Sequence, residues 1–145
     1  MKNNNQRPGV GIGVMVLKDN KVLLGKRHGD PKKADSELHG EGSWTMPGGK
    51  LHFKEELEEC AKRELFEETG IEADKEKLKI ISVTNDIVFD AHFVTIGFMC
   101  KEFKGEPKVM EPDEITQWKW FDFNNLPSPI FFPSKKILKK FKKDL

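Results

Sequence analysis

Several features that would place a sequence in a special class are scarce here. There are two cysteines, Cys60 and Cys100, and they stand far apart without a CxxC pair. The sequence therefore predicts neither a zinc site nor a disulfide framework, and we interpret both as reduced, buried thiols. No apolar run approaches the roughly 18 residues of a membrane-spanning helix. We expect a cytoplasmic protein without a membrane partner.

The chain also lacks a large net charge of either sign. The 25 lysines and arginines face 24 aspartates and glutamates, which leaves a formal net charge of +1. Because the charges balance, no nucleic-acid partner is expected for the chain as a whole. The chain also lacks an internal repeat and a linker, and its 145 residues are the length of one ordinary domain. A single domain over 1–145 is expected.

Short apolar segments alternate with turn residues along the chain. Segments 10–17 and 21–27 predict a β-hairpin, because the Lys-Asp-Asn between them is typical of a turn. Further strands are predicted at 44–53, broken by Pro47, Gly48 and Gly49, and at 78–89, 92–103 and 117–123. Helix formers at 55–69, followed by Gly70, predict a helix, and 134–145 predicts a basic amphipathic one. This order predicts an α/β sandwich rather than a bundle or barrel.

Three segments outside this pattern bear on function. Residues 28–43 have no periodicity, and so long a loop suggests a functional role. The lysines of 134–145 favour a packed terminal helix with a solvated face, with a contact to RNA or an acidic partner as the alternative. Phe131 and Phe132 either contact a ligand or anchor the last helix to the core.

Three glutamates occupy the last turn of the helix predicted at 55–69, where the backbone dipole is already negative. At 100° per residue, Glu64 and Glu68 lie about 40° apart, with Glu67 about 60° to the other side of Glu64. Leu57 and Ala61 share that face, so the acidic stripe continues the apolar stripe. The repulsion and the unfavourable helix end together cost about 1–3 kcal/mol.

A divalent cation would relieve this repulsion, which the pair of Arg63 with Glu67 relieves only in part. Ligands that are all oxygen favour Mg²⁺ or Mn²⁺ over zinc. Because Mg²⁺ on a few carboxylates completes its shell with substrate phosphates, phosphate chemistry is the hypothesis. Gly48 and Gly49 just upstream allow the backbone to approach a ligand or metal, and Lys50 follows. By themselves these glycines are more typical of a tight turn.

Residues 49–71 resemble the Nudix box, G-x5-E-x7-R-E-U-x-E-E-x-G-U, where U is apolar. The match includes every defined position, namely Gly49, Glu55, Arg63, Glu64, Leu65, Glu67, Glu68, Gly70 and Ile71. Segments 7–16, 22–27, 44–49 and 111–127 resemble the MutT-like, nucleotide-hydrolysing branch of that family. The resemblance implies an α/β/α sandwich around a mixed β-sheet. It also implies Mg²⁺- or Mn²⁺-dependent hydrolysis of a nucleoside diphosphate linked to another moiety.

The resemblance implies roles for the matched residues of the metal site. Glu64 and Glu68 match the principal metal ligands of the family, and Gly48 matches a glycine that contributes a backbone carbonyl. Glu67 matches a third ligand or a group that orients water. Arg63 matches the residue that holds a glutamate in place.

Other matched residues bear on substrate binding. Arg27 resembles an arginine that reaches the substrate phosphates, and Lys50 is expected to assist it beside Gly49. The nucleotide-specific relatives suggest that Phe131 stacks on the nucleobase of the substrate. Glu55 matches an acidic group that supports the site.

Two points depart from the family pattern or stay open. Lys54, Glu55 and Glu56 stand where relatives often have Gly-Glu-Ser or Gly-Glu-Thr, so the usual hydroxyl N-cap is missing and an irregular helix start is expected. A further glutamate beyond the box often serves as base or extra ligand. Glu111 and Glu114 are both candidates for it.

The expected function is hydrolysis of a (d)NTP to a (d)NMP and pyrophosphate. The box is common to hydrolases of ADP-ribose, nucleotide sugars and dinucleoside polyphosphates, so these remain alternatives. A nucleotide-sensing domain without activity is a third reading, against which the intact box argues. The sequence leaves open the preferred base, the use of oxidised nucleotides, and whether the protein is a monomer or homodimer.

Overall fold

The computed structural model describes residues 6–34 and 36–143. Asp35 of the predicted loop and Asp144 and Leu145 of the predicted last helix lie outside the described residues. The strands are β1 (Gly9–Lys18), β2 (Lys21–Arg27), β3 (Trp44–Thr45), β4 (Gly48–Lys50), β5 (Glu72–Ala73), β6 (Lys79–Val88), β7 (Ala91–Cys100), β8 (Phe103–Lys104) and β9 (Ile115–Asp122). The helices are α1 (Leu57–Thr69), α2 (Phe132–Lys143) and a short 3₁₀ turn, η1 (Lys75–Lys77).

Seven strands form one mixed sheet. Its order is β3-β2-β1-β7-β6, with β4 paired to β1 and β9 paired to β2. β1 and β7 run parallel, whereas β1 pairs antiparallel with β2 and with β4. The length of β1 allows these three pairings, because its first half meets β4 and its end turns into β2. β5 and β8 form a separate two-stranded ribbon.

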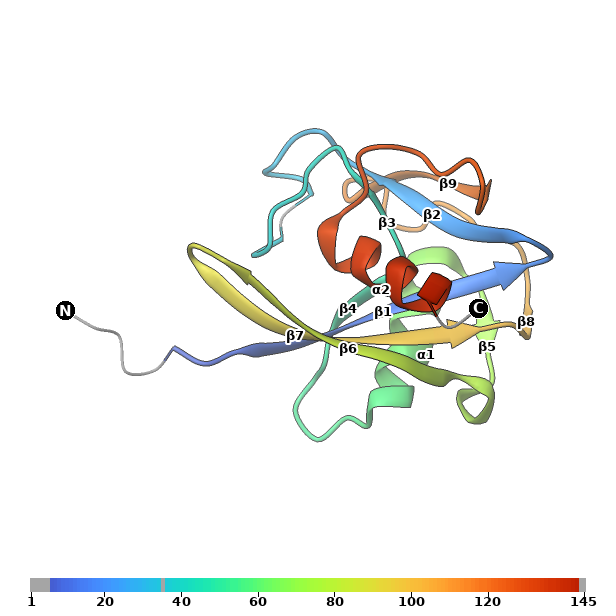
Figure 1. Cartoon of the computed structure of the whole chain (residues 1–145), viewed down its shortest axis with the longest axis horizontal. Helices are drawn as coiled ribbons and strands as arrows, with labels where there is room; N and C mark the ends of the chain where they lie inside the picture. The colour runs from blue at the N-terminus through green and yellow to red at the C-terminus, as the bar shows by residue number, and fades with distance from the viewer. Residues whose placement is uncertain (1–5, 35, 144–145) are drawn as a thin grey trace.

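The two helices cover opposite faces of the sheet (Figure 1). Alternation along β1 explains why: Ile12, Val14 and Val16 pack on the side of α1, whereas Met15 and Leu17 pack on the side of α2. The side chains that complete these two cores are Cys60, Ala61 and Leu65 from α1, and Ile137 and Leu138 from α2. The predicted α/β/α sandwich around a mixed sheet is confirmed.

Several element boundaries differ from the prediction. The last helix, predicted from residue 134, begins at Phe132, and the last strand, predicted from residue 117, begins at Ile115. The helix predicted from residue 55 begins at Leu57, and its N-cap Glu56 makes no side-chain capping bond. The preceding Lys54 has a φ of 67°, as expected for an irregular start. The strand predicted at 44–53 is two short strands, and the one predicted at 92–103 ends at Cys100. None of the helices in the described ranges is both long and apolar enough to cross a bilayer.

Candidate active site

Glu68, in the last turn of α1, is the most deeply buried carboxylate of the box, with 8% of the residue exposed. The N–H of Gly48 on β4 donates to its Oε1 at 2.7 Å. Burial raises the pKa of Glu68 well above its usual range, the Gly48 bond opposes this shift, and the charges of Glu64, Glu111 and Glu114 add to it. Among the described residues, no cationic side chain lies within salt-bridge distance of Glu68.

Glu64 lies one turn earlier and rests against the backbone of β4. A Cβ added at Gly49 would collide with the Glu64 carboxyl group, so a glycine is needed at that position. A Cβ at Gly48 would likewise collide with the carbonyl of Ile12. Gly49 therefore lets α1 bring the Glu64 carboxylate close to β4, whereas Gly48 lets β4 lie close to β1.

Arg63 links the box residues to one another. Its Nε donates to Glu55 at 2.7 Å, its Nη1 donates to Glu64 at 2.7 Å, and its Nη2 donates to the Lys50 carbonyl at 3.0 Å. The bond to Arg63 lowers the pKa of Glu55 to about 2, and these pairs raise the pKa of Arg63. Glu67 is the most exposed partner, at 3.3 Å and with 48% of its side chain accessible. Arg63 thus fixes Glu64 and leaves Glu67 freer to move.

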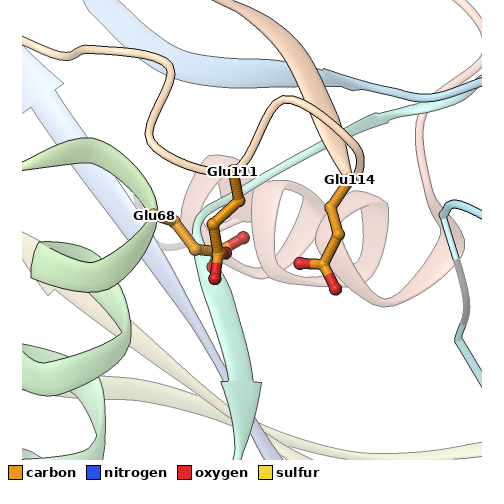
Figure 2. Close-up of side chains that lie close together, drawn as sticks. All are labelled: Glu68, Glu111 and Glu114. Carbon is orange, nitrogen blue, oxygen red and sulfur yellow. The ribbon is translucent and has the colours of Figure 1, made fainter.

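Both late glutamates reach the same site. The segment before β9 turns at Glu111, whose carbonyl accepts from the N–H groups of Glu114 and Ile115. Figure 2 shows the side chains of Glu111 and Glu114 converging with Glu68, and one carboxylate oxygen from each lies within 4.8 Å of the others. Burial and the charge of Glu114 raise the pKa of Glu111. The sequence left open whether Glu111 or Glu114 serves as the further glutamate of the site, and the structure brings both of them to Glu68.

Arg27, at the end of β2, lines the same cavity as this cluster. Its Nη2 donates to the carbonyl of Ala34 in the loop 28–43 at 2.8 Å, and its Cζ lies 4.8 Å from the centre of the Phe131 ring. Burial lowers the pKa of Arg27, while the nearby Glu68 and Glu114 raise it. Its Nε is buried without a hydrogen-bond partner among the described residues. The arginine is therefore held in place and keeps one donor unused.

Lys50 lies at the end of β4 and is exposed. Its Nζ is 2.8 Å from a carboxylate oxygen of Glu37, which belongs to the loop 28–43. Its ammonium group also lies 5.8 Å from the ring centre of Phe93. In this state the lysine is engaged by the loop.

One cavity of about 470 Å³ connects these groups. Of the residues predicted for the site, its lining includes Arg27, Gly48, Gly49, Lys50, Glu64, Glu67, Glu68, Glu111, Glu114 and Phe131. The cavity is also lined by residues that the sequence did not single out, namely Leu38, Thr45, Met46, Phe93, Thr95, Ser134 and Ile137. They come from four parts of the chain, namely the loop 28–43, the end of β3, β7 and α2, and only the tertiary structure brings these parts together, so no local pattern indicates them.

Comparison with known proteins places the chain in a family. The NUDIX domain model matches residues 7–141. The chain belongs to the Nudix family. Among Nudix proteins, the ADP-ribose pyrophosphatase of Methanocaldococcus jannaschii is 33% identical over 134 residues, which cover 92% of this chain and 73% of that protein. The oxidized purine nucleoside triphosphate hydrolase of Danio rerio is 30% identical over 142 residues, covering 89% and 83%.

The structural likeness agrees with the sequence likeness. The crystal structure of a MutT NUDIX hydrolase from Burkholderia pseudomallei superposes with a TM-score of 0.82 at 31% identity, covering 93% of this chain and 98% of that one. The protein is a Nudix hydrolase that acts on nucleoside diphosphate-linked substrates. Nudix hydrolases generally use a divalent metal ion, and the glutamate cluster offers ligands for one.

Proposed function

We propose that this Nudix hydrolase converts a (d)NTP and water to a (d)NMP and pyrophosphate. The observation that carries the proposal is that a single cavity is lined by a carboxylate cluster, two cationic side chains and several apolar side chains. Arg27 and Lys50 supply positive charge for a chain of phosphates. Leu38, Met46 and Phe93 supply an apolar surface for one base.

The donor set of the cavity fits a hard divalent cation. Every side-chain donor of the cluster is a carboxylate oxygen, as Mg²⁺ and Mn²⁺ prefer. Glu68 is buried and has no cationic partner among the described residues, so a bound cation would offset its desolvation. We propose Glu64, Glu67, Glu68 and the Gly48 carbonyl as ligands, with Glu111 or Glu114, which reach the same cluster as Glu68, as the base or an extra ligand. When bound, such an ion polarises phosphoryl oxygens and lowers the pKa of water.

The residues of the chain have distinct tasks in this proposal. Arg63 holds the Glu64 carboxylate through its 2.7 Å bond. Glu67 has room to accept a proton from the attacking water at a carboxylate oxygen, because it is the most exposed of the three. Water adds to the α-phosphorus, and the bond from this phosphorus to the oxygen that bridges it to the β-phosphate breaks. Pyrophosphate is the leaving group. Arg27 and Lys50 stabilise the negative charge that develops on the leaving phosphates. For this, Lys50 leaves its ion pair with Glu37 and pairs with a substrate phosphate instead.

Substrate identity is tested with purified protein and Mg²⁺ on a panel of NTPs, dNTPs, oxidised dNTPs, ADP-ribose and diadenosine polyphosphates. Products are separated by chromatography, so that monophosphate and pyrophosphate are measured directly. The proposal predicts that a triphosphate has the highest kcat/KM. A higher value for ADP-ribose would overturn the triphosphate assignment and leave the family chemistry intact. Tight nucleotide binding without turnover of any compound would indicate a sensor.

The catalytic roles are tested by Glu67→Gln and Glu68→Gln. Each is expected to lower kcat by about 10²–10⁴-fold, because a proton acceptor or a cation ligand is lost. Glu59→Gln is the matched control, since Glu59 lies on the same helix and is exposed. Circular dichroism and thermal unfolding establish that all three variants fold. A Glu67 variant or a Glu68 variant with near wild-type turnover would refute the role given to that residue.

A further inference from the structure

The loop 28–43 contacts a part of the sheet that is remote in sequence, the turn that joins β6 to β7 (Figure 1). We call the second half of this loop, residues 36–43, the strap. Three strap residues line the cavity of the candidate active site, namely Ser36, Glu37 and Leu38. The strap therefore connects one wall of the cavity with the turn between β6 and β7.

His39 makes the contact between the strap and that turn. Its Nε2 lies 3.1 Å from a carboxylate oxygen of Asp90, and its ring is nearly parallel to the ring of Phe89, with 6.2 Å between the ring centres. The side chains of His39 and Asp90 are 50% and 45% exposed, and Phe89 is 95% exposed. Because so little surface is buried, the contact fixes the position of the strap and does not extend the hydrophobic core.

The backbone at His39 supports the same interpretation. Its φ is 66°, a left-handed conformation that glycine adopts without steric cost and that most side chains avoid. The next residue, Gly40, has a φ of 94°. The backbone of the strap would thus favour glycine at position 39 as well, and the contact with the turn gives a reason for the histidine side chain.

The strap has a second contact of a different kind. Glu37 pairs with Lys50 at 2.8 Å, and the two side chains are 57% and 62% exposed. Exposed ion pairs contribute little to stability, so this pair is easily exchanged. The Glu37 carboxylate occupies the ammonium group that the proposed function assigns to a substrate phosphate. Glu37 and the substrate therefore compete for Lys50.

We propose that His39 is a positioning residue, which keeps the strap attached to the turn while a substrate phosphate displaces Glu37 from Lys50. The inference rests on the proposed function, because the competition is for the phosphates of the substrate. Leu38 is 8% exposed and precedes His39, so the attachment keeps this apolar side chain in the cavity wall. Loss of the attachment weakens substrate binding, whereas loss of the Glu37 carboxylate strengthens it.

The attachment is tested from both of its sides. His39→Asn removes the ring, and asparagine tolerates the left-handed backbone. F89A/D90G removes both partners and keeps a turn-forming residue at position 90. A third variant combines these changes. KM and kcat are measured with Mg²⁺ and the compound of the substrate panel that has the highest kcat/KM. Hydrogen exchange of the strap amides is measured without substrate.

All three variants are expected to raise KM at least about threefold and to keep kcat within about twofold of wild type, because binding is lost equally in the ground state and the transition state. The combined variant should be no worse than the weaker of the other two, since each removes the same contact. The strap amides should exchange faster in all three. An unchanged KM, unchanged exchange, or additive losses would overturn the role of His39.

His92→Ala is the control for the β6–β7 hairpin. His92 lies on β7, and its Nε2 is 2.9 Å from the side-chain oxygen of Asn85. This variant should leave both KM and the exchange of the strap at wild-type values. A rise in KM equal to that of F89A/D90G would show that any change in the hairpin has this effect, and would overturn the proposal.

Glu37→Gln gives a signal of the opposite sign. It should lower KM by about two- to fivefold, because the competition for Lys50 is removed. Glu41→Gln removes the same charge from an exposed position of the strap and should leave KM unchanged. A higher KM in Glu37→Gln, or an equal fall in both variants, would refute the competition.

The choice of compound separates this inference from the proposed function. If ADP-ribose has a higher kcat/KM than every triphosphate, the triphosphate assignment fails, and the same variants measured with ADP-ribose still decide the role of His39. If a triphosphate is the best substrate and His39→Asn leaves its KM unchanged, the proposed function stands and the role of His39 is refuted.

Discussion

At the scale of single residues, the site holds charges in places that are costly for the folded chain. Glu68 is buried beside other carboxylates, and the one backbone N–H that donates to it, from Gly48, offsets only part of the cost of burying its charge. Because burial raises its pKa, folded protein binds a proton at Glu68 more tightly than unfolded protein does. The contribution of Glu68 to the free energy of unfolding is therefore highest at acidic pH and falls as pH rises from the ordinary carboxyl pKa toward the raised one.

Glu68→Gln should remove the cost of burying the Glu68 charge. In EDTA near neutral pH, the variant is expected to be more stable than wild type by about 1–3 kcal/mol, because an uncharged amide replaces a desolvated carboxylate. The difference should shrink below the ordinary carboxyl pKa of about 4.3, where Glu68 is protonated in both states. Urea unfolding at several pH values measures both effects. Excess Mg²⁺ should then stabilise wild type more than the variant, and a less stable variant in EDTA would contradict this account.

At the scale of elements, the start of α1 shows what the missing hydroxyl costs. Glu56 occupies the N-cap with φ −74° and ψ 153°, the extended conformation that suits a cap, yet its side chain caps nothing. The preceding Glu55 is engaged by Arg63 instead. Glu55 therefore makes the contact that supports the site, whereas Glu56 at the adjacent N-cap makes no capping bond.

Glu56→Ser should stabilise the protein by about 0.5–1 kcal/mol, because a serine hydroxyl at this position accepts from a first-turn N–H. Thermal unfolding is expected to show a midpoint higher by about 1–4 °C. The kcat/KM should not change by more than about twofold, since Glu56 is exposed and does not line the cavity. An unchanged or lower midpoint would show that the first turn finds another partner for its N–H groups.

At the scale of the whole molecule, an ion pair between a buried aspartate and a partly exposed lysine attaches α2 to the edge strand β6. Asp86 is 0% exposed and lies 2.8 Å from the Nζ of Lys136, while Thr84 donates to its other oxygen at 3.1 Å. Lys136 also donates to the carbonyl of Asn85 at 2.7 Å. Because the same helix lines the cavity, this contact also positions one wall of the site.

Lys136→Ala should destabilise the protein by about 2–4 kcal/mol, because it leaves the Asp86 carboxylate buried without its cation. The double variant K136A/D86N should recover part of that loss, and urea unfolding of the four proteins gives the coupling between the two residues. Lys139→Ala is the control, expected to change stability by less than about 0.5 kcal/mol. A zero coupling energy would mean that the pair does not hold α2.

The sequence predicted the elements and the box well because those signals are local. Alternation places Val14 and Val16 on one face of β1, and helical spacing places Glu64 and Glu68 on one face of α1. Long-range placements were beyond such reasoning. The pairing of Lys50 with Glu37 and the contact of Arg27 with Phe131 join residues whose separation along the chain says nothing about their distance in space. The cytoplasmic location and the single domain stay predictions.

By itself, the sequence determined that carboxylates gather on one face at the end of a helix, because residue spacing and helical geometry fix those neighbours. Only the tertiary structure decided which other groups join them. The turn at Glu111 brings two further glutamates to Glu68, and the packing of Ile137 and Leu138 against the sheet leaves lysines of α2 exposed. A net charge of +1 hides this separation of acidic and basic groups, because a sum over the chain carries no positions.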